Sequence, residues 1–188
     1  MTRIAIALTP EFADWECALL MAVARAYLGV DVVTASPDGG EVTSMGGLRV
    51  TPDLGYDGLD PLDFDALVIP GGLSWEKDTA PDIGPLVHGF HAAGKVVAGI
   101  CAASSALAAT GLLDRVAHTG NALAAHREQA AYRGEAHYRD QPQAVSYGRI
   151  VTAPGNSPVS FTTEILKALE LWGPEAEAEI AAFAREHR

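Results

Sequence analysis

Short runs of apolar, mostly β-branched residues alternate with helical stretches along this chain. Four of these runs are predicted to be buried strands: residues 4–8, 30–34, 66–69 and 96–100. Five stretches are predicted to be helices: residues 15–28, 83–93, 102–109, 158–171 and 175–187. Strands that alternate with helices form βαβ units, which build a mostly parallel sheet covered by helices on both faces. The sequence therefore predicts an α/β fold.

Two short hairpins complete the expected elements. One pairs residues 42–43 with 49–50, and the other pairs 144–147 with 150–152. The stretch 51–61 is rich in Asp, Gly and Pro and is predicted to be an irregular connection. Because no repeat or long linker interrupts the 188 residues, we expect one domain over residues 1–188.

Charge and cysteine content narrow the function classes. The chain carries 13 Lys and Arg against 24 Asp and Glu, a net charge of −11, which argues against binding to nucleic acid or an anionic membrane. Its amino-terminal apolar run is too short for a signal peptide, and no stretch approaches the roughly 20 apolar residues of a membrane span. With only two cysteines, a cytoplasmic protein is expected.

Cys101 directly follows the predicted strand 96–100 and precedes a helix of small residues. A strand, a reactive residue with small neighbours and a helix together are typical of a nucleophile elbow, a strained turn that lifts one side chain above the sheet. The amino-terminal N–H groups of the following helix favour a thiolate at this position. The alternative is a buried structural cysteine, which is the common state of an isolated cysteine.

Two further motifs follow predicted strands. Gly71 and Gly72 follow residues 66–69 after Pro70. Glycines there let backbone N–H groups face a ligand, so Gly72 and Ala102 are candidates for an oxyanion hole. Glu16 begins an almost wholly apolar helix after the first strand. A carboxylate there is costly unless it has a partner or a role, the alternative being a solvated glutamate in a first helical turn. Sites form beyond the carboxyl ends of parallel strands, where these motifs meet.

Taken in order, four motifs resemble the ThiJ/PfpI superfamily, the class I glutamine amidotransferase-like proteins that include the parkinsonism-associated oxidative-stress protein. They are Phe-Ala-Asp-Trp-Glu at 12–16, Ile-Pro-Gly-Gly at 69–72, Gly-Ile-Cys-Ala at 99–102 and Thr-Ala-Pro-Gly at 152–155. The resemblance covers essentially the whole chain. It implies a flavodoxin-like three-layer sandwich with a nucleophile elbow, and a homodimer. It also implies that Cys101 is the nucleophile, that Glu16 is its carboxyl partner, and that the backbone of Gly71, Gly72 and Ala102 binds an oxyanion or substrate.

Departures from the family pattern shape the remaining expectations. Members with protease-like descriptions often carry a histidine directly after the nucleophile, where this chain has Ala102, so peptidase activity is not expected. In the segment after the elbow helix, His118 is the best candidate for a general acid or base near Cys101, with Thr119 as the alternative counterpart. Trp75 is expected to wall the cleft or to be a packed surface side chain.

Other polar and reactive residues receive less specific expectations. Cys17 is expected in the core or an interface, because it lies on a different side of its helix from Glu16. Asn156 and Ser157 are expected to face the cleft or to cap the following helix. The other five histidines are expected to be solvated: His88, His91, His126, His137 and His187. No zinc-type spacing, P-loop or dinucleotide-binding motif is present, so no metal or cofactor is expected.

These residues lead to three hypotheses for function. The first is a Cys101-dependent hydrolase or lyase for small molecules. For such an enzyme, the resemblance implies glyoxalase-, deglycase- or isonitrile hydratase-like chemistry linked to stress and metabolite damage. The second is a redox-responsive stress protein in which Cys101 is oxidised and Glu16 stabilises its sulfinic acid. The third is a binding or chaperone-like dimer that retains the elbow without using it.

Overall fold

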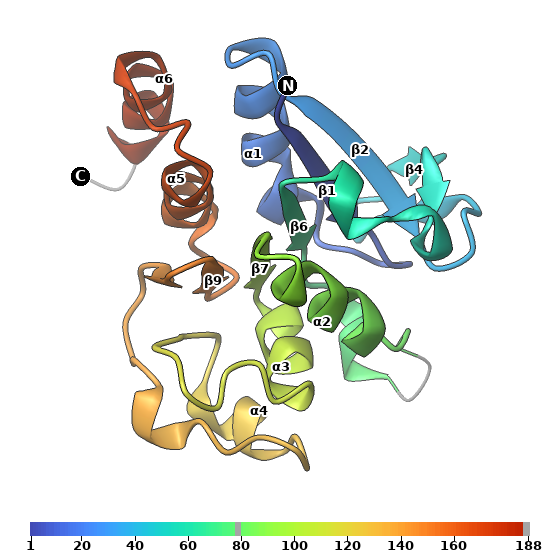
Figure 1. Cartoon of the computed structure of the whole chain (residues 1–188), viewed down its shortest axis with the longest axis vertical. Coiled ribbons are helices and arrows are strands. Elements are labelled where there is room, and N and C mark those ends of the chain that lie inside the picture. The colour runs from blue at the N-terminus through green and yellow to red at the C-terminus, as the bar shows by residue number, and fades with distance from the viewer. Residues whose placement is uncertain (78–79, 186–188) are drawn as a thin grey trace.

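A seven-stranded sheet forms the centre of the protein, whose computed structural model describes residues 1–77 and 80–185 (Figure 1). The strand order is β5-β2-β1-β6-β7-β9-β8, and only β8 and β9 pair antiparallel. The strands are β1 Arg3–Ala7, β2 Asp31–Ser36, β5 Leu54–Gly55, β6 Ala66–Ile69, β7 Val96–Ile100, β8 Val145–Tyr147 and β9 Ile150–Ala153. The α/β fold with a mostly parallel sheet is therefore confirmed.

Helices cover both faces of this sheet, because alternate strand residues point to opposite sides. Ile4 and Ile6 of β1 join one core with α1, α5 and α6, whereas Ala5 and Ala7 join a second core with α2 and α3. The helices are α1 Asp14–Ala26, α2 Gly84–Ala92, α3 Ala102–Ala109, α4 Leu123–Arg127, α5 Pro158–Ala168 and α6 Pro174–Ala184. Three layers result, as expected for a flavodoxin-like sandwich (Figure 1).

Most predicted boundaries agree with these elements to within a few residues. β6, β7 and α3 match the prediction at both ends, and β1 and β2 are displaced by a residue or two. The stretch 51–61 is more ordered than predicted: it contains β5, which pairs with β2 at the sheet edge, and a 3-10 helix, Tyr56–Gly58. The predicted end of the last helix, including His187, lies outside the described residues.

The hairpin of β3 Val42–Thr43 and β4 Arg49–Val50 forms as predicted, apart from the main sheet. It holds the loop that enters α1. Glu11 N–H donates to the Thr43 carbonyl over 2.7 Å, and Met45 N–H donates to the Phe12 carbonyl over 2.9 Å. This loop carries the polypeptide from the carboxyl end of β1 to Glu16.

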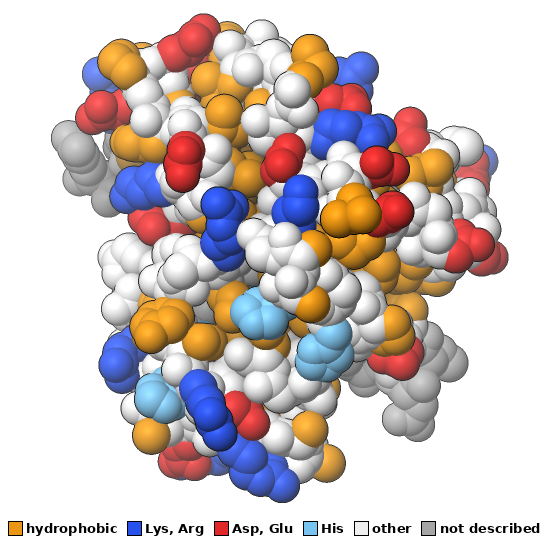
Figure 2. All heavy atoms as spheres, in the orientation of Figure 1, with side chains coloured by type: hydrophobic (Ala, Val, Ile, Leu, Met, Phe, Trp, Pro, Cys, Tyr) orange, Lys and Arg blue, Asp and Glu red, His pale blue; other side chains and the backbone are white. Residues whose placement is uncertain are grey.

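The surface view shows acidic and basic side chains interspersed on one face rather than gathered by sign (Figure 2). Of the helices in the described part of the chain, none has both the length and the apolar character needed to cross a membrane.

Candidate active site

Cys101 occupies the turn between β7 and α3, where the sequence predicted an elbow. Its backbone has φ 60° and ψ −131°, a conformation that few residues other than glycine adopt. Cys101 N–H donates to the Ala153 carbonyl over 2.9 Å, which ties the turn to the end of β9. The residue is partly exposed. A strained, anchored turn thus holds the side chain at the carboxyl edge of the sheet.

Glu16 lies in the first turn of α1 and is completely buried. Its Oε2 accepts a hydrogen bond of 2.6 Å from the N–H of Gly71, whereas its Oε1 has no hydrogen-bond partner among the described residues. A Cβ at position 71 would lie 2.6 Å from the Cβ of Cys101, so only glycine fits between them. Glu16 is therefore not the solvated glutamate of the alternative interpretation, and Gly71 donates its N–H to the carboxyl group rather than to an oxyanion.

The start of α1 is fixed on two sides, which fixes Glu16. Ala13 N–H donates to the Gly71 carbonyl over 3.0 Å. The Asp14 carboxylate accepts the Ser44 hydroxyl over 2.5 Å and the Gly46 N–H over 2.9 Å. Helix α1 is thereby tied both to the turn after β6 and to the hairpin.

Burial shifts the pKa values of both groups at the site. It raises the pKa of Glu16 to about 7, although contacts with Cys101 and the Gly71 N–H act in the opposite direction. Burial likewise raises the pKa of the Cys101 thiol to about 11. The Asn121 donor lowers this pKa, the Glu16 carboxylate raises it further, and the Ala102 N–H lowers it. The Ala102 N–H at the start of α3 lowers the pKa of the thiol, as expected for a helix terminus, but burial acts more strongly in the opposite direction. The resting pair is a thiol beside a carboxyl group that is ready to accept its proton near neutral pH.

Gly155, in the turn after β9, closes the site beside the sulfur. A Cβ there would lie 2.8 Å from the Cys101 sulfur and 2.8 Å from Glu16 Oε1, so those two atoms are at most twice that distance apart. The Gly155 N–H donates to Asn121 Oδ1 over 2.9 Å, and its carbonyl accepts the Trp15 indole N–H over 3.1 Å. The glycine therefore leaves open the space that the thiol and the carboxyl share.

Asn121 is the polar side chain that reaches the sulfur from the segment after α3. Its Nδ2 donates to the Cys101 sulfur over 3.2 Å. The sequence predicted a polar counterpart in this segment but did not identify Asn121. Asn121 lies only two residues beyond Thr119, so its place in the sequence pointed to the right segment. Because that segment has no regular structure, the sequence does not tell which of its side chains faces the sulfur.

His118 is not beside Cys101, contrary to the prediction. The ring is completely buried, with Nδ1 2.8 Å from the Val116 carbonyl and Nε2 2.8 Å from the Tyr132 hydroxyl. Both nitrogens are thus occupied away from the sulfur, and burial lowers the pKa of His118. Thr119 does not face the sulfur either, since its N–H donates to Thr152 Oγ1 over 2.8 Å and its hydroxyl is directed to the Gln141 carbonyl.

Three other expectations are corrected. Trp75 donates its indole N–H to the Pro70 carbonyl over 3.0 Å and packs on the core of α2 and α3, so it is a packed side chain and not the wall above Cys101. Ser157 precedes α5, but its hydroxyl donates to the Pro142 carbonyl and does not cap the helix. His126 was expected to be solvated, yet it is completely buried, and burial lowers its pKa to about 4.

The N–H groups of Gly72 and Ala102 remain the candidates for oxyanion binding. The Ala102 N–H is directed at the Cys101 sulfur. Gly72 lies between Gly71, whose carbonyl accepts from Ala13, and Leu73, whose N–H donates to the Glu11 carbonyl over 3.1 Å. Among the described residues, the Gly72 N–H has no backbone acceptor of its own. Both groups are thus placed at the edge of the sheet where the sulfur lies, and their role stays a prediction.

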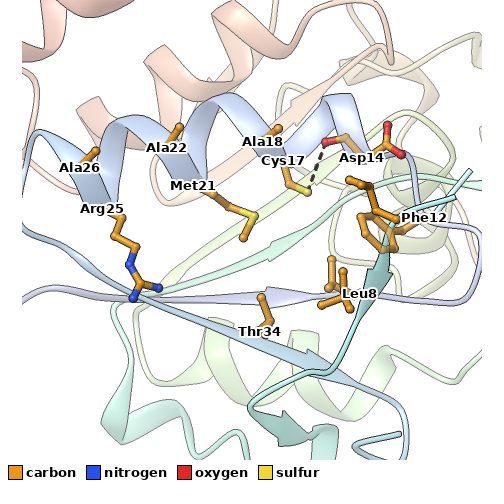
Figure 3. A pocket seen from close by; sticks show the side chains of 12 residues that line it. Leu8, Phe12, Asp14, Cys17, Ala18, Met21, Ala22, Arg25, Ala26 and Thr34 are labelled. Atoms are coloured by element: carbon orange, nitrogen blue, oxygen red, sulfur yellow. Dashed lines mark hydrogen bonds between the residues drawn. The ribbon is translucent and has the colours of Figure 1, made fainter. Parts of the chain in front are cut away.

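An apolar groove of about 720 Å³ lies along the other side of α1 (Figure 3). Cys17 lines it from a nearly fully buried position, which confirms its expected place in the core, and burial raises the pKa of this thiol to about 12. Its sulfur lies 3.7 Å from the Asp14 carbonyl. Cys101 does not line this groove, so the two thiols have separate environments. The other lining residues are Leu8, Phe12, Asp14, Ala18, Met21, Ala22, Arg25, Ala26, Thr34, Leu48 and Val50.

Comparison with known proteins assigns the family. The DJ-1/PfpI family model matches residues 2–168. The crystal structure of DJ-1 superfamily protein Atu0886 from Agrobacterium tumefaciens superposes with a TM-score of 0.98 at 69% identity, covering 100% of both chains. The uncharacterized protease YoaZ of Bacillus subtilis is 34% identical over 170 residues, 86% of this chain and 80% of that protein. A deglycase of Pyrococcus horikoshii is 35% identical over 86 residues, 45% of this chain and 52% of that protein. The chain belongs to the DJ-1/PfpI family.

Proposed function

We propose that this protein is an enzyme that converts small reactive carbonyl compounds, with Cys101 as the covalent nucleophile and Glu16 as the group that moves protons. One observation carries the proposal. A completely buried carboxyl group, held by the Gly71 N–H at one oxygen and unpartnered among the described residues at the other, lies beside a thiol on a strained elbow. Relatives named as deglycases support this substrate class.

The first step follows from the resting protonation of the pair. The Cys101 sulfur adds to an aldehyde carbon while the Glu16 carboxylate takes the thiol proton, so one C–S bond forms and the carbonyl becomes an oxyanion. The N–H groups of Gly72 and Ala102 are assigned to that oxyanion. Protonated Glu16 then returns its proton to the oxyanion, which gives a neutral hemithioacetal and restores the carboxylate.

Conversion of an α-oxoaldehyde needs one more proton transfer by the same group. Glu16 removes a proton from the carbon attached to sulfur and leaves an enediolate. The hydroxyl proton shifts from the first oxygen to the second, and Glu16 returns its proton to the neighbouring carbon. The product is a thioester of a 2-hydroxy acid, which one water molecule hydrolyses to the acid and the free Cys101 thiol. No outside oxidant or reductant is required, because one carbon is oxidised as its neighbour is reduced.

Peptide hydrolysis fits this site poorly, although several relatives carry protease names. A cysteine peptidase pairs its thiol with a histidine, and here Ala102 follows the nucleophile. The two buried histidines in the adjoining segment, His118 and His126, direct no ring nitrogen to the sulfur.

Turnover of methylglyoxal tests the proposal. Wild-type protein is expected to convert it to lactate, and Cys101→Ser and Glu16→Gln are each expected to reduce the rate at least about a hundredfold, as the loss of a nucleophile or general base does. Cys17→Ala removes the other thiol and is expected to retain the rate. Undiminished turnover in Cys101→Ser would refute the mechanism. Parallel assays with an isonitrile and a peptide substrate decide between substrate classes.

Redox sensing is the second candidate, and the different exposure of the two thiols favours it. Cys101 is partly exposed beside the free oxygen of Glu16, whereas Cys17 is 2% exposed. Mild peroxide should therefore oxidise Cys101 first, with Glu16 available to hydrogen-bond a sulfinic acid. Equal oxidation of both cysteines by mass spectrometry would contradict this role.

We propose that the partner of this protein is a second copy of the same chain, which forms a homodimer. The apolar groove along α1 and the exposed Leu48 of the hairpin offer a surface on which a second copy can pack. Ala22→Glu places a charge on this exposed part of α1. Light scattering should then report a dimer for the wild type and a monomer for the variant, and a monomeric wild type would contradict the proposal.

A further inference from the structure

The side chain of Asn121 bridges two parts of the active site. Its amide nitrogen donates to the Cys101 sulfur over 3.2 Å, and its amide oxygen accepts the Gly155 N–H over 2.9 Å. Because a backbone N–H only donates, the amide has one favourable orientation. A flipped amide would place its NH₂ against the Gly155 N–H and its oxygen against the sulfur. The sulfur therefore always receives a donor from this residue.

Asn121 is exposed, yet hydrogen bonds and close packing hold the backbone of the two residues that precede it. Thr119 N–H donates to Thr152 Oγ1 over 2.8 Å, and the Tyr138 hydroxyl donates to the Gly120 carbonyl over 3.2 Å. A Cβ at Gly120 would collide with the side chains of Ser104 and His126, so this backbone lies directly on α3 and α4. The exposed amide thus stands on a backbone segment with little freedom to move.

Glu16 is the titratable group that faces the sulfur. Among the described residues, the groups that act on Cys101 are Glu16 from α1, Asn121 from the segment after α3 and the Ala102 N–H of α3. Of these three, only Glu16 gains or loses a proton. The Gly155 turn presents backbone, and the Trp15 indole N–H is directed to the Gly155 carbonyl. Both ring nitrogens of His118 are occupied, as described above. His126 Nδ1 lies 3.2 Å from the Ala122 carbonyl, and its Nε2 has no hydrogen-bond partner among the described residues.

We propose that Asn121 is a catalytic residue: a fixed, non-titrating donor that stabilises negative charge on the Cys101 sulfur, while Glu16 alone carries the proton. The inference rests on the proposed role of Cys101 as nucleophile. It adds that one residue stabilises the charge on the sulfur and another carries the proton. When Glu16 takes the thiol proton, the sulfur becomes an anion that the Asn121 amide and the Ala102 N–H stabilise. An amide cannot take up that proton, so the proton stays on Glu16 for the later steps.

Titration of the Cys101 thiol by its thiolate absorbance in the ultraviolet, with Cys101→Ala subtracted, tests this role without any substrate. Asn121→Asp keeps an acceptor for the Gly155 N–H but replaces the donor with a negative charge. Asn121→Ala removes the donor to the sulfur without adding a charge, and it also removes the acceptor of the Gly155 N–H. We expect the apparent pKa of Cys101 to rise by about one unit in Asn121→Ala, a tenfold loss of thiolate at a given pH, and by more in Asn121→Asp. Asn156→Ala, which removes an exposed amide that bonds Ser157, is the matched control and should follow the wild type.

A second readout separates the donor role from a merely structural one. Asn121→His restores a donor and adds a titrating ring, so the pH profile of Cys101 alkylation should gain an inflection that neither the wild type nor Asn121→Ala shows. An unchanged thiol titration in Asn121→Asp, with native circular dichroism, would overturn the proposal. So would an inflection near neutral pH that persists in Glu16→Gln, because a second proton carrier would then face the sulfur. If the titration shifts as expected but no carbonyl compound is turned over, the proposed reaction fails, while the role of Asn121 as the donor that stabilises a Cys101 thiolate stands.

Discussion

The Glu16→Gln variant should gain stability relative to the wild type as the pH rises from acidic to alkaline. Burial raises the pKa of Glu16 from 4.5 to about 7, so the folded state favours the protonated carboxyl. A raised pKa contributes stability that is fully present below the unfolded value and is lost as the pH rises through the folded value. The wild type therefore bears the cost of a buried carboxylate above about pH 7, whereas the amide of the Glu16→Gln variant remains neutral throughout.

The magnitude follows from the two pKa values. Between about pH 5 and pH 8, the wild type loses about 2.5 kcal/mol of unfolding free energy through Glu16, because each unit of pKa difference corresponds to about 1.4 kcal/mol. The Glu16→Gln side chain has a suitable geometry, since its amide oxygen can accept the Gly71 N–H while its NH₂ occupies the place of the unpartnered Oε1. At roughly 2–4 °C per kcal/mol for a chain of this length, Tm of the variant should gain about 5–10 °C on the wild type over that interval.

Urea and thermal unfolding of both proteins at the two pH values measure this difference, and the other titrating groups cancel because they are common to both. Glu177→Gln makes the same chemical change at an exposed position in the first turn of α6, and should run parallel to the wild type. If the stability difference between Glu16→Gln and the wild type is the same at both pH values, the carboxyl is not desolvated by its burial and the assignment of Glu16 as a base near neutrality fails.

Other substitutions and labels probe the same geometry. Gly155→Ala would place a methyl group 2.8 Å from both the Cys101 sulfur and Glu16 Oε1, so alkylation of Cys101 should slow at least about tenfold while circular dichroism stays native. His126→Phe should reduce the loss of unfolding free energy at acidic pH. Burial lowers the pKa of His126 to about 4, so this residue contributes stability that is present above pH 6.5 and is lost as the pH falls through 4, at most about 3 kcal/mol. An unchanged loss of stability at acidic pH, measured by urea unfolding, would contradict the burial of that ring. In native protein, iodoacetamide should label Cys101 alone, with Cys17 labelled only after unfolding; equal labelling by mass spectrometry would show that α1 opens.

Strand ends were the most predictable part of the molecule, and the reason is physical. A short β-branched run followed by Gly71 or Cys101 can only be a buried strand that ends in a tight turn, and parallel pairing then brings such ends to one edge of the sheet. Glu16 was singled out because a carboxyl group at the start of an almost wholly apolar helix is costly without a partner, although a solvated glutamate in a first helical turn was the alternative. These constraints are local in sequence and act through a fixed topology.

The segment after α3 was not predictable in the same way. It contains no strand, only an isolated bridge from His118 to Tyr138, so no periodicity tells which of its side chains turns toward the sulfur. Asn121, rather than His118 or Thr119, faces Cys101 because the buried rings of His118 and His126, with the partly buried ring of Tyr138, occupy the inner side. His126 itself lies on a helix of five residues, which is too short to show a buried face by its pattern.

The resting state of the thiol depends on a balance that sequence alone does not contain. A helix terminus after Cys101 is visible in the sequence and favours a thiolate, but the amount of water excluded by Gly71, Gly155 and the start of α1 is a property of the folded chain. In this protein the exclusion of water is the larger effect.

The site is assembled from five separate stretches of chain: the start of α1, the turn after β6, the elbow, Asn121 and the turn at Gly155. No single stretch holds two of the interacting side chains, so no fragment or partly folded intermediate can contain a working site. Reactivity of the thiol is therefore a reporter of the whole fold. Because burial in the assembled site raises the pKa of the thiol, its rate of alkylation should rise when any one of these stretches loosens, before the loss of helix content that marks global unfolding. Aged samples can therefore be sorted by this rate even when their spectra are still native.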